Sequence, residues 1–216
     1  MSECIHVTAP HGSDEWFQGR CGVVTASMFG EVRKRLKSGA NKGDFSKAAH
    51  DYAFKLAVER ISGELLDDPQ FDSWQARRGR EMEPEARMAY EEREAVLVEE
   101  TGLALTSDHR FGASVDGLVD DDGSVEIKCY LAPSKLAPIL LSGEVPEDVK
   151  DQVQGGMLIT GRLWSDFVLY CPALKSINKH LTIIRVLRDE KYIAELKADL
   201  EAFDALVEQY KSQLEK

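Results

Sequence analysis

The sequence predicts an α/β protein in which a central mixed β-sheet is flanked by helices and a long helix ends the chain. Two segments, residues 45–61 and 189–214, carry apolar residues at helical spacing. Between them lie short β-rich segments bounded by turn residues, a pattern that favours strands. The length of 216 residues allows one full core, so we expect a single domain over residues 1–216.

The expected helices follow from this spacing and from the residues at their ends. Residues 25–36 should form a short helix, and the segment 37–44, with its Ser, Gly and Asn, a mobile basic loop. The helix over 45–61 should end at Gly63, since glycine readily adopts the left-handed conformation that closes helices. Further helices are expected over 73–94, interrupted at Pro84, and over 149–160. The last helix should begin at Asp189, a residue type that caps helix N-termini.

The expected strands lie in the middle of the chain, at residues 96–98, 112–119, 124–131, 166–171 and 181–187. Asp121-Asp122-Gly123 separates the second strand from the third. Asp-Gly tolerates the positive φ angles of tight turns, so these two strands should form a hairpin.

The charge distribution permits DNA binding without demonstrating it. A net charge of −11 opposes contact with phosphates, which require Lys and Arg. Residues 18–47, however, hold seven basic side chains against two acidic ones. Such a strip can line a binding surface while an acidic exterior repels DNA elsewhere, although a solvated loop has the same composition. The basic residues of this strip are Arg20, Arg33, Lys34, Arg35, Lys37, Lys42 and Lys47.

Several classes of protein are disfavoured by what the sequence lacks. No apolar stretch is long enough to span a membrane, and the first residues have no basic start followed by an apolar run, so we expect a cytoplasmic protein without a membrane partner. The four cysteines are far apart and form no CxxC pair, which argues against a zinc ribbon. The five histidines show no ligand spacing. A metal, if bound, would therefore have carboxylate ligands, which indicates a hard cation.

The informative polar residues are Asp116, before the predicted hairpin, and Glu126 and Lys128 after it. Side chains alternate along a strand, so Glu126 and Lys128 should share one face while Val125 and Ile127 enter the core. The hairpin should bring Asp116 close to Glu126. Two adjacent carboxylates repel each other unless a proton or cation joins them, and Mg²⁺ accepts such oxygens readily.

A lysine beside such a metal is suited to orient or deprotonate the attacking water and to stabilise charge on a phosphate. The tripeptide taken alone also fits a surface ion pair on an exposed strand. A calcium-binding EF-hand loop does not fit, because Leu118 occupies the place of its first ligand.

An acidic residue, a short hairpin and Glu-x-Lys on the next strand form the signature of the PD-(D/E)xK nucleases. Beyond this signature, the chain resembles the phage lambda exonuclease family across most of its length. The resemblance implies a restriction-endonuclease-like fold. Four blocks in the family's order carry it: Asp14-x-Trp16-x-x-x-Arg20-x-Gly22-Val-x-Thr25-Ala-Ser27, Arg78-Gly79-Arg-Glu-Met-Glu83 followed by Ala86-Arg87, Ser114-x-Asp116-Gly-Leu through Glu126-x-Lys128-Cys129, and Gln152-Val-Gln154.

The resemblance implies catalytic roles for the matching residues. Asp116 and Glu126 would bind two Mg²⁺ ions, for which Mn²⁺ would substitute, together with the backbone carbonyl of Ile127. Glu83 would be an acidic partner of the second ion, directly or through its water. Lys128 would act on the nucleophilic water.

The same resemblance implies that Gln152 helps to hold the active site. Arg20, Ser27 and Ser114 would bind the 5′-phosphate of the strand being degraded, as a guanidinium fork and hydroxyl donors should. Two departures from the family pattern concern neighbours of these residues. Val115 replaces a frequent proline, and Pro84 directly follows Glu83 and biases its backbone away from the helix.

The function implied by the resemblance is a Mg²⁺-dependent 5′→3′ exonuclease, encoded by a phage or prophage in a bacterial host. It would degrade one strand of linear double-stranded DNA to mononucleotides and leave 3′ single-stranded overhangs for recombination by strand annealing. A homotrimeric ring around the duplex would let an acidic protein be processive. A single-strand annealing protein of the same phage would be its partner.

Two alternatives remain open at this point. One is a related PD-(D/E)xK endonuclease, or a CRISPR-associated exonuclease of the same core. The latter enzymes carry an iron–sulfur cluster on four cysteines, which the scattered cysteines disfavour. The other alternative is a non-catalytic DNA-binding or assembly module on the nuclease fold. The intact Asp-Glu-Lys set argues against such a module.

Overall fold

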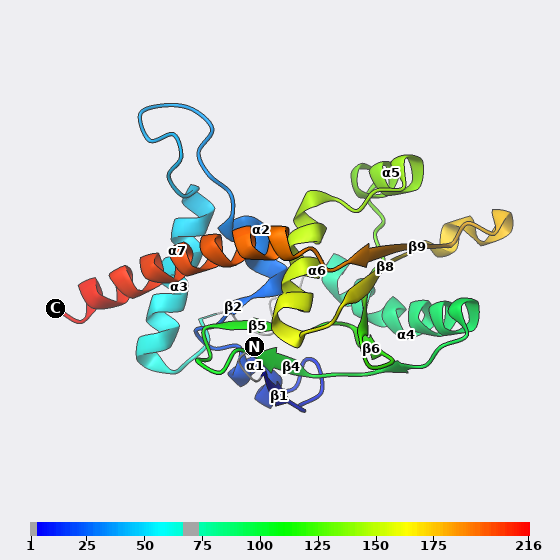
Figure 1. The fold of residues 1–216 in the computed structure, drawn as a ribbon, viewed down its shortest axis with the longest axis horizontal. Helices are drawn as coiled ribbons and strands as arrows, with labels where there is room; N and C mark the ends of the chain where they lie inside the picture. Colours follow the sequence, from blue (N-terminus) through cyan, green and yellow to red (C-terminus); the bar gives the residue numbers. More distant parts are fainter. Residues whose placement is uncertain (1–3, 67–73) are drawn as a thin grey trace.

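The computed structural model describes residues 4–66 and 74–216 and confirms the predicted α/β class. The strands form two mixed sheets rather than one (Figure 1). The smaller sheet has the order β1 (Ile5–Val7), β4 (Leu103–Leu105), β5 (Phe111–Ala113) and β2 (Val24–Thr25). The larger has the order β3 (Val98–Glu99), β6 (Gly117–Val119), β7 (Gly123–Lys128), β8 (Trp164–Tyr170) and β9 (Leu181–Leu187).

The single strand expected at 112–119 is wrong, because the chain changes sheets within it. β5 ends at Ala113 in the smaller sheet, and β6 begins at Gly117 in the larger. Val115, between them, packs so close to α6 (Glu147–Thr160) that a Cβ on Gly156 would lie 3.1 Å from its side chain. This packing against α6 places Asp116 at the junction of the two sheets. The local alternation of residues, from which the strand was predicted, contains no information on that contact.

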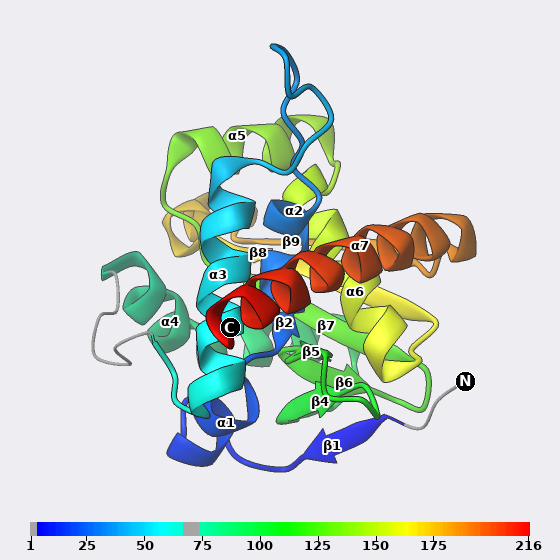
Figure 2. The ribbon, with the colours of Figure 1, turned by 90° about the vertical axis from the view of Figure 1, so that its left-hand side faces the viewer.

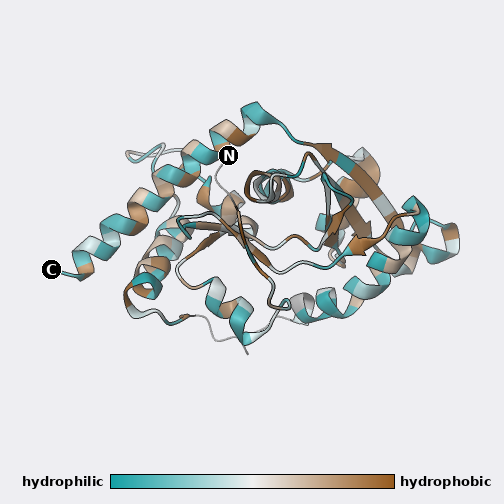
Figure 3. Cartoon of the chain, turned by 60° about the horizontal axis from the view of Figure 1, so that its bottom comes forward, coloured by the Kyte–Doolittle hydropathy of each residue, from teal (hydrophilic) through white to brown (hydrophobic). Residues whose placement is uncertain are grey.

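The helices follow the expected order but differ in extent. α3 (Lys47–Ser62) ends at Gly63 with φ of 69°, as predicted, and α7 (Glu190–Leu214) begins at Asp189, whose side chain accepts a hydrogen bond from the Tyr192 amide at 3.0 Å. α7 crosses α3 (Figure 2) and alternates between polar and apolar stretches along its length (Figure 3). α6 is longer than expected by two residues at its start.

Four buried clusters lie among the described residues, and three of them hold the longer helices in place. α3 and α7 share one cluster, in which Leu56, Leu200 and Phe203 are buried. α4 (Trp74–Glu94) packs Ala86 and Tyr90 against the larger sheet. α6 contributes to two clusters, with Val153 and Met157 facing Phe167 of β8 in one and Ile159 in the other. The helix that carries Gln152 is therefore fixed from two sides.

The helix expected over 25–36 is confirmed only over residues 26–32 and is not continuous. β2 is followed by a 3₁₀ turn (η1, Ala26–Met28) and the short helix α2 (Phe29–Val32). A Cβ on Gly30 would lie 3.3 Å from the Asp148 backbone, and the Arg33 guanidinium reaches Asp151 of α6 at 2.6 Å. These tertiary contacts override the local preference for a longer helix.

The expected interruption at Pro84 is also wrong, because α4 runs through it. Ala86 and Tyr90 beyond the proline are fully buried, and the Arg87–Glu83 pair, 3.3 Å apart, spans it. Burial of this face offsets the hydrogen bond that a proline removes. The expected start at residue 73 lies outside the described residues.

Several elements were not predicted from sequence: β1, β4, α1 (Asp14–Gly19), α5 (Pro133–Ser142) and the 3₁₀ segment η2 (Pro172–Ile177). The predicted loop at 37–44 projects from the body of the molecule, between the bridged residues Arg35 and Phe45 (Figures 1 and 2). None of the helices in the described ranges combines the length and apolarity needed to cross a membrane.

Candidate active site

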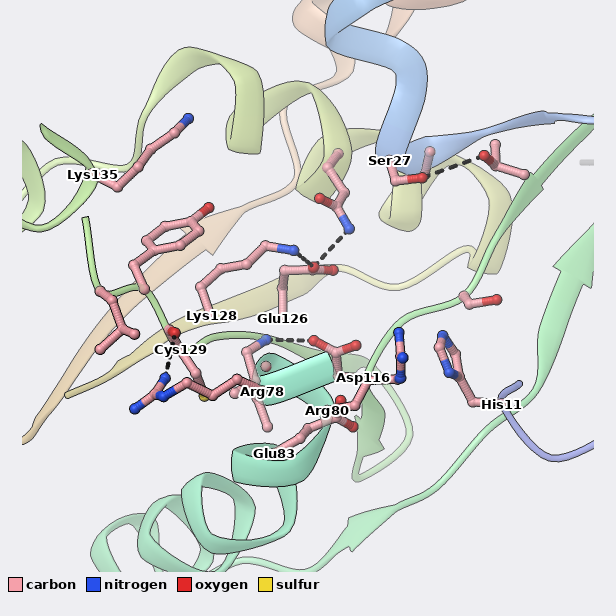
Figure 4. Close-up of a pocket in the computed structure, with 18 of the residues that line it drawn as sticks. His11, Ser27, Arg78, Arg80, Glu83, Asp116, Glu126, Lys128, Cys129 and Lys135 are labelled. Carbon is pink, nitrogen blue, oxygen red and sulfur yellow. Dashed lines mark hydrogen bonds and ion pairs between the residues drawn. The ribbon is translucent and has the colours of Figure 1, made fainter. Parts of the chain in front are cut away.

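A cavity of about 950 Å³ opens where the chain passes from the smaller sheet to the larger. Segments far apart in the sequence meet in it, from α1, η1, α4, β7 and α6 (Figure 4). Every site residue predicted from sequence lines this cavity: Arg20, Ser27, Glu83, Ser114, Asp116, Glu126, Ile127, Lys128 and Gln152.

Asp116 is held at the open edge of β7 by backbone hydrogen bonds. The β6–β7 ladder ends at the pair Gly117–Val125, and the Asp116 amide continues it by donating to the Val125 carbonyl at 3.1 Å. The Asp116 carboxylate then takes the next position, accepting from the Ile127 amide at 2.6 Å. The N–H and C=O of one strand residue point to the same edge, so the Ile127 carbonyl faces the side on which Asp116 lies.

Glu126 and Lys128 share one face of β7, as predicted from strand alternation. The Lys128 Nζ donates to a Glu126 carboxylate oxygen at 2.6 Å. The same oxygen accepts from the Gln152 side-chain amide, also at 2.6 Å. Val125 and Ile127 point the other way and are buried in the cluster beneath α4. The Glu126 side chain is only 4% exposed, so its two donors fix it firmly.

Glu83 approaches the two carboxylates from α4 (Figure 4). Arg87, one turn later, donates to it at 3.3 Å. Burial and then the charge of Asp116 raise the pKa of Glu83 to about 7. The helix thus brings a third acidic group within electrostatic range of Asp116.

The carboxylates at this site destabilise each other's charged forms. Burial, followed by the charges of Asp116 and Glu83, raises the pKa of Glu126 to about 7, against the opposing effect of Lys128. Burial also raises the pKa of Asp116. For Lys128, burial acts to lower the pKa, but the charges of Glu126 and Asp116 outweigh it and raise that pKa. Lys128 is therefore a protonated donor at neutral pH.

This donor set fits a hard divalent cation. Buried carboxylates that repel one another gain most from a cation placed between them, and Mg²⁺ prefers such oxygens. Among the described residues, no three His, Cys, Asp or Glu side chains lie close enough together to form a complete cage. A cation here would rely on Asp116 and Glu126 together with backbone, water or substrate oxygens, which is the usual way in which Mg²⁺ binds.

The residues predicted to bind the 5′-phosphate gather around one indole ring. The Trp16 Nε1 donates to the Ser114 hydroxyl at 2.9 Å, and the Arg20 guanidinium carbon lies 4.2 Å from the Trp16 ring centroid. Arg20 also donates to the Thr25 hydroxyl at 3.3 Å, which lies 3.4 Å from the Ser27 hydroxyl. Trp16 and Thr25 thereby connect all three residues.

Four basic residues of the cavity were not recognised as site residues from sequence: His11, Arg78, Arg80 and Lys135. Arg78 and Arg80 lie on α4 before Glu83, and Arg78 donates to the Cys129 carbonyl at 3.2 Å. Arg80 precedes Glu83 by three residues within one helix, a spacing that could have indicated it. His11 comes from the turn before α1, where the sequence offers no such signal.

Fewer side chains of the basic strip are available to contact DNA phosphates than its composition indicated. Arg33 pairs with Asp151 and Asp199, and Arg35 with Asp199, so both serve to join α2 and α7. Lys37 and Lys42 are exposed in the projecting loop, and Lys47 is exposed at the start of α3.

All four cysteines are free thiols that form no disulfide.

Solved structures share this architecture. An alkaline exonuclease (LHK-Exo) from Laribacter hongkongensis matches with a TM-score of 0.80 and 32% sequence identity, over 94% of this chain and 96% of that chain. A structure of LHK-Exo in complex with dAMP matches with a TM-score of 0.81 and the same identity and coverage. A phage related exonuclease from Haemophilus somnus 129PT, 16% identical, matches with a TM-score of 0.66 over 89% of this chain and 96% of that chain, and shows the fold alone. No curated protein matches the chain significantly.

The fold is therefore the α/β fold found in exonucleases, with a carboxylate–lysine site at its centre. The family model for the YqaJ-like viral recombinase domain matches residues 15–163, and the chain belongs to this family. This family match, together with the similarity to solved exonucleases, confirms the resemblance to the lambda exonuclease family that the sequence motifs indicated. The comparisons support a nuclease function.

Proposed function

We propose that this protein is a Mg²⁺-dependent exonuclease that degrades one strand of linear double-stranded DNA from its 5′ end. The observation that carries the proposal is the convergence of two clusters in one cavity. Asp116, Glu126 and Lys128 form a hydrolytic set, and Arg20 and Ser114 beside them form a phosphate-binding set. A cavity that contains a hydrolytic set and a phosphate-binding set can hold the terminal 5′-phosphate while the next phosphodiester bond is cleaved.

Asp116 and Glu126 would hold the Mg²⁺ ions, with the Ile127 carbonyl as a further ligand and Glu83 as an additional acidic group. Bound Mg²⁺ supplies a water of lowered pKa and neutralises charge on the phosphate. Mn²⁺ has the same preference for oxygen ligands and should substitute.

The chain's own residues position the reacting groups. Lys128, held protonated by its acidic neighbours, donates to the attacking water or to a phosphate oxygen and stabilises the charge that develops there. Gln152 fixes the orientation of Glu126. Water adds to phosphorus and the bond to the 3′ oxygen breaks, which releases a 5′-mononucleotide and leaves a new 5′-phosphate on the shortened strand. Each cycle thus regenerates the group that Arg20 would bind.

The similarity to LHK-Exo supports the release of mononucleotides, since that enzyme has been solved in complex with dAMP, a mononucleotide. The direct test is a digest of linear duplex with either a 5′-phosphate or a 5′-hydroxyl end, in Mg²⁺ or in EDTA. We expect mononucleotides to be released from the phosphorylated 5′ end in Mg²⁺. Cleavage of circular duplex at internal sites would instead favour the related endonuclease, and no metal-dependent cleavage would favour a non-catalytic module.

Assembly into a closed ring, most simply a homotrimer, would reconcile the net charge of −11 with processive digestion. Repulsion of the acidic exterior from DNA acts over roughly 8–10 Å at physiological salt, so a monomer should dissociate often. A threaded duplex cannot leave sideways. The 3′ overhang left by the ring would be the substrate of a single-strand annealing protein, which a pull-down with the annealing protein of the same phage or prophage would detect.

A further inference from the structure

His11 is presented to the cavity by a well-defined turn. The Ser13 amide donates to the Pro10 carbonyl at 3.0 Å, and Gly12 has φ of 82°, which are the features of a type II turn. Ser13 then caps α1 by accepting from the Trp16 amide at 3.2 Å. The position of His11 is therefore tied to the helix that carries Trp16.

The imidazole of His11 is aimed at the group of residues around Trp16. Its ring centroid lies 4.2 Å from that of Trp16, the same indole that supports Arg20 and orients Ser114. Figure 4 shows His11 on the side of the cavity where Asp116 lies. Across residues 4–66 and 74–216, neither ring nitrogen of His11 has a hydrogen-bond partner.

The charges around His11 show what kind of ligand fits there. Burial lowers the pKa of His11, Asp116 opposes this effect, and the charges of Arg20 and Arg80 lower the pKa further. Asp116 exerts the largest of these charge effects, but the Arg20 guanidinium shares the Trp16 indole with the imidazole and Arg80 lines the same cavity. A position that gathers nitrogen donors and cations on an accessible surface suits an anion.

We propose that His11 is a specificity-determining residue that donates a hydrogen bond from its ring to the terminal 5′-phosphate, beside Arg20 and Ser114. This inference rests on the proposed function, since it assigns a further contact within the proposed phosphate-binding set. It differs from a packing role, in which the ring would only support the Trp16 indole.

Three substitutions separate these roles. His11→Phe keeps an aromatic ring against Trp16 and removes both nitrogens. His11→Gln keeps a donor and removes the ring. His6→Phe makes the same change at an exposed histidine of β1 that does not line the cavity, and is the matched control.

The experiment measures the preference for a phosphorylated over a hydroxyl 5′ end in two ways. Binding of end-labelled duplex is measured by anisotropy in EDTA, and initial cleavage rates are measured in Mg²⁺. We expect His11→Phe to reduce both preferences by about tenfold, the scale of one hydrogen bond to an anion. His11→Gln should retain more of each preference than His11→Phe, and His6→Phe should match the wild type.

The opposite pattern overturns the inference: full preference in His11→Phe with loss in His11→Gln shows a packing role. A wild-type protein that binds both ends equally also overturns it. Because the binding arm does not require hydrolysis, failure of the proposed function is seen separately, as an absence of Mg²⁺-dependent cleavage by the wild type.

Discussion

Glu126 should make the stability of the metal-free protein fall as the pH rises. Its pKa is raised from 4.5 to about 7, which corresponds to about 3 kcal/mol of folding free energy lost when the buried carboxyl ionises. The unfolded chain releases this proton first, so the loss begins above about pH 4.5 and is complete above about pH 7. Glu126→Gln carries no ionisable group at this position and should escape the loss.

The comparison is therefore between pH profiles. From pH 5 to pH 8 in EDTA, the free energy of unfolding of the wild type should fall by about 2.5 kcal/mol relative to Glu126→Gln, or roughly 5–10 °C in Tm. In the variant, Asp116 and Glu83 are no longer repelled by a charged Glu126, which increases the difference between the two profiles further. Mg²⁺ at pH 8 should stabilise the wild type and not the variant.

Urea unfolding at the two pH values measures this difference, with Glu195→Gln, an exposed carboxylate on α7, as the control. The control should run parallel to the wild type. Parallel profiles for Glu126→Gln as well would refute the reasoning, because they would show that the Glu126 carboxyl is not strained by burial and its acidic neighbours.

Three further predictions concern catalysis, substrate and assembly. Lys128→Ala should lower the cleavage rate on the order of 10²–10⁴-fold, and a near-normal single-turnover rate would exclude the role given to Lys128. Arg20→Ala should weaken the preference for a 5′-phosphorylated over a 5′-hydroxyl end, measured as a ratio of initial rates, and an unchanged ratio would place the phosphate elsewhere. Light scattering at micromolar concentration should give a closed oligomer, most simply a trimer of the 24.1 kDa chain, and a stable monomer that digests processively would rule out the ring.

The clustering of Asp116, Glu126 and Lys128 could be predicted because their arrangement is local. Asp116, Glu126 and Lys128 lie on two strands joined by a tight hairpin, and strand alternation decides their faces. No long-range information is needed to bring them together. Burial of Val125 and Ile127 on the opposite face confirms the register that the apolar pattern indicated.

The group of residues around Trp16, which we propose to bind the 5′-phosphate, could not be derived in this way. Trp16 and Ser114 are 98 positions apart, and their hydrogen bond forms because α1 buries Trp16 against Leu103 and Leu105 of β4. The resemblance to a family indicated Arg20, Ser27 and Ser114, whereas His11, outside the matching blocks, had no signal in the sequence. Tertiary packing also decided the extent of α2, where Gly30 lies against α6.

Digestion by the wild type and by Asp116→Ala tests the central claim most directly. Both proteins are incubated with linear duplex carrying a labelled 5′-phosphate in Mg²⁺, after circular dichroism has shown that both are folded. The wild type should release labelled mononucleotide, and Asp116→Ala should release none, because loss of one carboxylate removes both charge and geometry from the metal site. Cleavage by Asp116→Ala at a rate close to the wild type would contradict the assignment of this cavity as the active site.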